Sequence, residues 1–324
     1  MFVIESYTCL QQFVPDLRKL FLEDELSLIR SARHRAKLLL TDRKKAPLIA
    51  NEIAQIAVSQ REKFLSAHSG WLAWLKRKLQ PDMGVFTYDG HVFSSSHAII
   101  FGYGTADVHL AQAHELGYLL GRYVSVFAPL TDKIERWYND DSMADRVQTK
   151  DIKYEELYCR GALGSLELGF AAACVLVLSS INMTHRVLRA FVKPTEPVFF
   201  KLKFLCAYHA QSSIQLIQDV LRPEGRLSSD ATKVFSELLR HPCAHWLRKR
   251  KHLRDFFVHY HPRVDRAFPP EASYDEVVDQ LLGRRRLAEI DVALDEYLEH
   301  LATKLAYGFA LNRNTFVSAP HVLK

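Results

Sequence analysis

Apolar residues recur along this chain at three- and four-residue steps, which predicts a mostly helical protein. Glycine and proline are sparse, at 13 and 12 of 324 residues, which favours long helices over a sheet of many strands. The segments with helical spacing are 15–40, 46–79, 106–137, 152–192, 197–221, 229–260 and 275–309. Because the last four follow one another through mostly short turns, we expect an antiparallel four-helix bundle. Ser229 or Asp230 should cap the third of these four, and Pro242 should break it.

One stretch has the alternation of a strand instead. Residues 85–88 and 91–93 flank Asp89-Gly90, a pair that suits a two-residue hairpin turn with positive φ. Residues 94–97 are expected to form a loop after the hairpin, and the polar stretch 139–151 is the candidate linker. The predicted organisation is an N-terminal helical region with a β-hairpin over 1–140, a helical bundle over 152–310, and a tail over 311–324.

Composition bounds the class and the compartment of the protein. Five scattered cysteines without a Cys-x-x-Cys pair speak against a disulfide framework or a structural zinc site, and suit a reducing cytoplasm. The most apolar run, 168–178, is shorter than the ~20 residues of a membrane span, so it predicts a buried central helix. The N-terminus has Glu5 and no basic start, so no secretory signal is expected. A net charge of +6 permits an anionic partner without requiring one.

The candidate chemistry lies at the end of the predicted helix 229–260. Arg254 is followed at once by Asp255 and then by two histidines, His259 and His261, before Pro262 ends the helix. The basic residues that flank this stretch are Arg248, Lys249, Arg250, Lys251 and Arg263. We interpret it as a candidate site that binds and cleaves a phosphodiester.

An arginine followed by a histidine at this spacing is a weak pattern by itself. The other pairs of this kind are Arg61 with His68, Arg240 with His245, and Arg254 with His261. Arg61 lies in the N-terminal region, and Pro242 interrupts the Arg240 pair. Only Arg254 lies at the closing turn of a predicted bundle helix with an acid beside it, so context favours that arginine.

The sequence Leu253-Arg254-Asp255-Phe256-Phe257-Val258-His259-Tyr260 resembles the signature of the HEPN (higher eukaryotes and prokaryotes nucleotide-binding) superfamily, and the resemblance spans roughly 152–310. It implies a helical bundle that is a metal-independent ribonuclease without a cofactor, as in toxin–antitoxin and antiviral systems. Arg254, Asp255 and His259 fit the three motif places. RNA, a second copy of the chain, and an antitoxin or a nucleotidyltransferase are the implied partners. The tyrosine modified in the nucleotidyltransferase branch stands two positions after the histidine, where this chain has His261.

The residue types agree with RNA cleavage. Histidine has a near-neutral pKa and can take the proton of a 2′-hydroxyl, and arginine can hold phosphate with two hydrogen bonds. The flanking basic residues would then contact the RNA backbone. On a continuous helix, positions 254 and 259 are about 140° apart, whereas 254 and 261 share a face. Either the helix loosens before His259, or two chains share one site.

Other interpretations of these residues stay open. Arginine and histidine near a helix C-terminus are favoured by the helix dipole, and basic runs are commonly solvated surface. The chain could therefore be a non-catalytic HEPN-like bundle that binds RNA or a protein, or a purely structural helical protein. His109, His114 and Glu115 lack the spacing of a zinc-protease helix, and no Gly-rich phosphate loop supports use of ATP or NAD.

Overall fold

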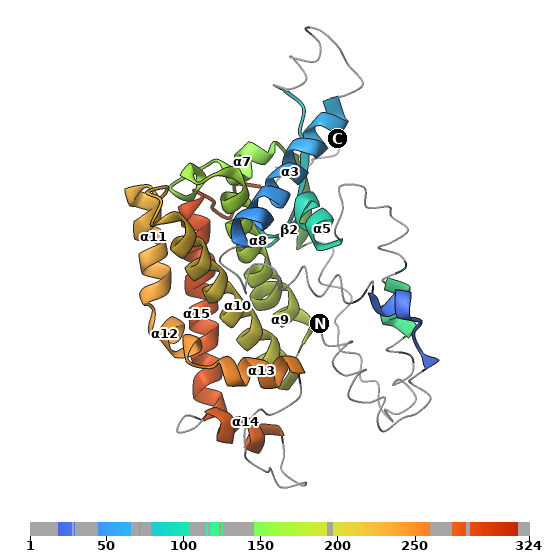
Figure 1. Cartoon of the computed structure of the whole chain (residues 1–324), viewed down its shortest axis with the longest axis vertical. Coiled ribbons are helices and arrows are strands. Elements are labelled where there is room, and N and C mark those ends of the chain that lie inside the picture. The colour runs from blue at the N-terminus through green and yellow to red at the C-terminus, as the bar shows by residue number, and fades with distance from the viewer. Residues whose placement is uncertain are drawn as a thin grey trace, which may run out of the picture.

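The chain forms a mainly helical protein with one small antiparallel sheet, as seen in a computed structural model (Figure 1). The structure describes residues 19–27, 29, 45–65, 71, 79–103, 115, 117–122, 125, 146–192, 197–259, 274–282 and 286–316. Most of the predicted helices 15–40 and 106–137 lie outside these residues.

The sheet has the strand order β2-β1-β3, with β1 at Met83–Tyr88, β2 at His91–Ser95 and β3 at Val147–Ile152. The predicted hairpin is confirmed, since Asp89 and Gly90 connect β1 and β2 with φ of 50° and 77°. A Cβ at Gly90 would lie 2.2 Å from the carbonyl oxygen of Arg313, so only glycine, which has no side chain, fits at this position of the turn.

Two expectations beside the hairpin are wrong. Residues 147–151, expected as the end of a linker, form most of β3, which pairs antiparallel with β1. The strand was missed because it is a partly exposed edge strand with only a weak apolar alternation. Residues 94–97, expected as a loop, instead end β2 and begin α5 (Ser96–Tyr103), and His97 is buried there.

Helix α8 (Leu168–Asn182) lies at the centre of the fold, and the prediction of a buried central helix is confirmed. Helix α3 (Ala46–Leu65) crosses α8 so closely that a Cβ on Gly169 would lie 1.9 Å from the carbonyl oxygen of Ala50. Leu168–Leu188 is long and apolar enough to cross a membrane, but 72% of its most apolar window is buried inside the protein. Residues before and after β3 contribute to the same hydrophobic core.

The segment 152–192 is not one helix, contrary to expectation. It contains α7 (Tyr154–Tyr158), the 3₁₀ turn η5 (Leu163–Ser165), α8, the π-helix η6 (Met183–Leu188) and α9 (Arg189–Phe191). A left-handed glycine, Gly161, lies in the connection before η5. Within η6 the backbone keeps helical direction but widens its turn.

Helix α10 (Pro197–Leu221) has the predicted bounds. The next predicted helix has two breaks rather than one, giving α11 (Ser229–Arg240), α12 (Pro242–Arg248) and α13 (Lys251–His259). Its cap is neither Ser229 nor Asp230 but Ser228, whose Oγ accepts the Ala231 N–H at 3.1 Å. Pro242 occupies the first turn of α12, where a missing N–H costs nothing.

The predicted helix 275–309 is also divided, into α14 (Tyr274–Leu282) and α15 (Leu287–Gly308). Helix α15 buries Ile290, Leu294, Leu298, Leu301 and Leu305, the stripe expected from their spacing. Helices α8, α10 and α11 each pack against α15.

Candidate functional site

The predicted motif lies on α13, a short helix that packs across α10 (Figure 1). Leu253, Phe257 and Val258 are buried, and the Phe257 ring meets Phe204 edge to face with ring centroids 5.1 Å apart. This apolar face fixes α13 against α10. Arg254 and Asp255 therefore occupy a defined place rather than a loose surface turn.

Arg254 is held on two sides. Its Nη1 is 2.8 Å from Oδ1 of Asp255, with side chains 20% and 13% exposed, and its guanidinium lies over the Tyr208 ring at 5.7 Å. Its Nε is buried and makes no hydrogen bond to the residues that the structure describes. The arginine is thus ordered before any anion binds, but its charge is partly compensated by Asp255.

The structure brings together only part of the predicted catalytic set. Residue 259 is the last residue of α13, its side chain lies outside the described residues, and so do His261 and Arg263. The helix does not end before residue 259, so positions 254 and 259 stay about 140° apart around its axis. Of the two arrangements expected, a loosened helix is wrong and a site shared by two chains remains a prediction.

The predicted RNA-binding run joins α12 to α13. Arg248, Lys249 and Lys251 are exposed, whereas Arg250 is half-buried with its guanidinium over the Trp246 ring at 5.3 Å. Nη1 of Arg248 donates to Oε1 of Gln215 at a long 3.4 Å. The exposed members therefore present positive charge to solvent directly before Arg254.

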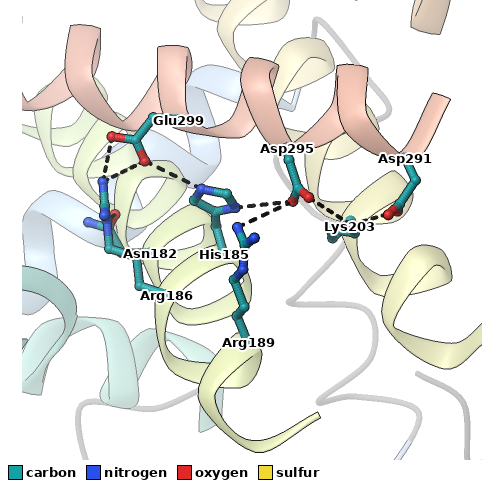
Figure 2. A network of polar contacts seen from close by, with 8 residues as sticks. All are labelled: Asn182, His185, Arg186, Arg189, Lys203, Asp291, Asp295 and Glu299. Carbon is teal, nitrogen blue, oxygen red and sulfur yellow. Dashed lines mark hydrogen bonds and ion pairs between the residues drawn. The ribbon is translucent and has the colours of Figure 1, made fainter. Parts of the chain in front are cut away.

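A second polar cluster, which the sequence did not reveal, connects α10, η6 and α15 (Figure 2). The Lys203 side chain of α10 is 0% exposed, and its Nζ lies 2.5 Å from Oδ1 of Asp291 and 3.2 Å from Oδ2 of Asp295. Asp291, Asp295 and Glu299 share one face of α15 because they are four residues apart. We call these residues, with Asn182, His185, Arg186 and Arg189, the ion cluster.

His185, on the π-helix η6, lies between two carboxylates of the ion cluster. Its Nδ1 is 3.5 Å from Oδ1 of Asp295, an ion-pair distance without hydrogen-bond geometry, and its Nε2 is 3.3 Å from Oε2 of Glu299. Burial alone would raise the pKa of the Asp295 carboxyl, but contact with His185 and the charge of Lys203 outweigh it and lower that pKa. Asp295 is therefore held as a carboxylate.

Arg186 is anchored from both sides. Its Nη2 donates to Oε1 and Oε2 of Glu299 at 2.9 and 2.8 Å, and its Nε donates to Oδ1 of Asn182 at 3.2 Å. The buried Asn182 in turn donates its Nδ2 to the carbonyl oxygen of Val92 at 2.8 Å, which connects η6 to the hairpin. Burial alone would raise the pKa of the Glu299 carboxyl, but the charge of Arg186 and its hydrogen bonds to that carboxylate outweigh burial and lower the pKa.

A polar pocket of about 320 Å³ opens beside the ion cluster. Its lining residues are Tyr88, Asp89, His91, Arg146, His185, Arg186, Arg189, Glu299 and Arg313. We call it the arginine pocket. Burial lowers the pKa of His91 to about 4, helped by the charges of Arg186 and Arg313, so that imidazole is neutral at pH 7.

The sequence offered one signal for this cluster, the three acids at four-residue steps on α15, which face the same way as part of its apolar stripe. Nothing local indicated that Lys203 or His185 would meet them, because these contacts join residues about 90 to 110 positions apart.

Within the described ranges, no group of three or more His, Cys, Asp or Glu side chains is arranged to hold a metal ion. Comparisons with protein-family models, with curated proteins and with solved structures find no match for this chain.

Proposed function

We propose that this chain is a metal-independent endoribonuclease of the cytoplasm that acts as a homodimer through the motif on α13. The observation that carries the proposal is the ordered Arg254, held 2.8 Å from Asp255 directly after the exposed residues Arg248, Lys249 and Lys251. Exposed cations bind the RNA backbone and release its counterions, and a fixed guanidinium can grip one chosen phosphate.

The reaction is a transfer of the phosphoryl group within RNA. His259 takes the proton of a 2′-hydroxyl, whose oxygen attacks the adjacent phosphorus, and the 5′-oxygen of the next nucleotide leaves with a proton from a second histidine. The products are a 2′,3′-cyclic phosphate and a 5′-hydroxyl end. Arg254 stabilises the additional negative charge of the phosphorane, and Asp255 positions the guanidinium.

The angular separation on α13 supports the homodimer. Positions 254 and 259 face about 140° apart on a continuous helix, so Arg254 of one chain and His259 of the other meet more readily than both of one chain. Two histidines, one neutral and one charged, then serve as base and acid on opposite sides of the phosphate. His261 is the alternative base within a single chain.

A second candidate is a non-catalytic bundle that binds RNA or a protein such as an antitoxin or a nucleotidyltransferase. The observation that favours it is that Arg254 already has structural partners, Asp255 and the ring of Tyr208. In that case the basic residues before Arg254 bind RNA, and no bond is broken.

Cleavage of a single-stranded RNA in EDTA separates the two candidates. We expect the wild-type protein to give 2′,3′-cyclic phosphate ends and Arg254→Ala to lower the rate at saturating RNA, because affinity is then no longer limiting. His259→Ala should abolish cleavage. His252→Ala is the matched control on the same helix, since this exposed histidine lies 3.4 Å from the Leu281 carbonyl oxygen and has no role in the proposed reaction.

The outcomes have distinct meanings. RNA binding by the wild-type protein without cleavage would establish the second candidate. Equal rates for His259→Ala and wild type would move the role of base to His261. When His259→Ala chains are mixed with wild-type chains, activity should fall with the square of the wild-type fraction, whereas a linear fall would show that each chain cuts alone.

A further inference from the structure

The arginine pocket gathers like charges from distant parts of the chain. Arg146 precedes β3, Arg186 and Arg189 belong to η6 and α9, and Arg313 lies in the segment after α15. Bringing four guanidinium groups to one cavity is unfavourable unless anions compensate them. Two carboxylates among the lining residues, Asp89 and Glu299, leave the four guanidinium groups with an excess of two positive charges.

Several donors of these arginines remain available. Arg186 uses Nε and Nη2 for Asn182 and Glu299, and Arg146 uses Nε and Nη2 for Asp89, so the Nη1 group of each is free of hydrogen bonds to the described residues. Arg189 is 3.9 Å from Oδ1 of Asp295. Their carboxylate partners fix the guanidinium planes of Arg186 and Arg146, so the remaining Nη1 groups are held in place as donors for the oxygens of a phosphate.

Arg313 differs from the other three, because no hydrogen bond or ion pair joins it to the part of the chain that the structure describes, although its charge helps to lower the pKa of Asp89 and of His91. It is exposed, yet its place is set by the backbone, since its carbonyl oxygen lies against the hairpin turn at Gly90. The pocket thus has three arginines that are already engaged and one that is available for an anion.

A second cavity of about 320 Å³ continues from the arginine pocket. The two cavities share His91, Arg186, Glu299 and Arg313, so they meet at these side chains. Beyond them the second cavity is bordered mainly by apolar residues, including Leu178, Ala302, Ala306, Leu311 and Phe316. The combined space is charged at one end and apolar at the other, with a size usual for small-molecule sites.

We propose that the arginine pocket binds a small phosphate monoester of nucleotide size, such as a nucleoside monophosphate. The dianionic phosphate neutralises the excess of two charges and accepts from Arg313 and from the free Nη1 groups of Arg146 and Arg186. The base and sugar occupy the apolar cavity. His91 lies where the cavities meet, and as a neutral imidazole it can share a hydrogen bond with the phosphate without adding charge. The proposal does not depend on RNA cleavage at α13.

Calorimetric titration of the full chain with AMP, adenosine and inorganic phosphate tests the proposal. We expect AMP to bind, phosphate to bind more weakly because it leaves the apolar cavity empty, and adenosine not to bind. Arg313→Ala should weaken AMP binding by about tenfold or more, because hydrogen bonds to charged groups are stronger than neutral ones. Arg240→Ala is the matched control, an exposed arginine at the end of α11.

Two further variants give the test independent readouts. Arg254→Ala should leave AMP binding unchanged, which separates this pocket from the proposed ribonuclease site. Binding of AMP should also raise the pKa of His91, followed by NMR, since an added anion opposes the charges of Arg186 and Arg313. The proposal is overturned if neither AMP nor phosphate binds at millimolar concentration, if adenosine binds as well as AMP, or if Arg313→Ala binds AMP as tightly as wild type.

Discussion

Replacing Lys203 by methionine tests how much the ion cluster contributes to stability. The ammonium group is fully buried, and its two carboxylate partners are 27% and 26% exposed. Methionine keeps most of the apolar volume of the side chain, so the main change is the loss of one positive charge. Asp291 then has no cation beside it among the contacts described, and Asp295 keeps only His185 and Arg189.

Removing one partner of a buried ion pair costs about 3–5 kcal/mol, because the other charge is left without compensation. The aspartates keep some contact with water, so we expect the lower end, about 3 kcal/mol. That is roughly a hundredfold change in the unfolding equilibrium constant. The measurement is urea unfolding followed by circular dichroism at pH 7.

Two further variants identify the cause of any loss. Lys203→Met combined with Asp291→Asn should recover part of the lost stability, because one unpaired carboxylate is removed together with its cation. Lys233→Met, an exposed lysine on α11, should change the unfolding free energy by no more than about 0.5 kcal/mol. If the free energy of unfolding of Lys203→Met differs from that of wild type by less than about 1 kcal/mol, the ion cluster does not stabilise the fold as its distances suggest.

Two other predictions concern the sheet and its surroundings. Burial lowers the pKa of His97, which is 2% exposed and 3.2 Å from the Tyr158 hydroxyl, to about 4. In the unfolded chain His97 binds its proton near pH 6.5, so the neutral imidazole contributes fully to the free energy of unfolding above that pH, and about 3 kcal/mol is lost as the pH falls toward 4. Urea unfolding of wild type and of His97→Gln at several pH values should show that the free energy of unfolding falls more steeply with acid for wild type. Gly90→Ala should destabilise more than Gly225→Ala in thermal unfolding, because both glycines have positive φ but only at Gly90 would the new Cβ meet backbone, at 2.2 Å from the Arg313 oxygen. Equal losses would show that the turn can move away from Arg313.

Local patterns were enough to predict much of the fold. The bounds of α10 and the hairpin at Asp89-Gly90 follow from apolar spacing, from proline and from the turn pair, all of which act over a few residues. Edge strand β3 was missed because it is specified by pairing with β1, about 60 residues earlier, and not by its own alternation. The additional helix breaks were missed for a related reason, since no proline stands between α12 and α13 or between α14 and α15.

The candidate sites divide in the same way. The motif on α13 is contiguous, so its residues could be named from the sequence, and the structure adds the pairing of Arg254 with Asp255. The arginine pocket could not be named, because its residues come from the hairpin, η6, α15 and the segment after α15. Only the packing of α15 against α8 and η6 brings them together.

Three departures from ordinary stable packing occur in the arginine pocket and in the ion cluster beside it. Residues 183–188 adopt π-helical rather than α-helical hydrogen bonding, a rare geometry that is frequent at functional sites. The turn places both His185 and Arg186 against the same carboxylate, Glu299. Close by, Lys203 is fully buried with its charge, and His91 is held neutral by its surroundings. Each feature is unfavourable alone, and proteins retain such features mainly where function requires them. Two of these features line the arginine pocket, and the third adjoins it through Asp295 and His185. This grouping, rather than any motif in the sequence, is the strongest physical argument that this face of the protein binds a ligand.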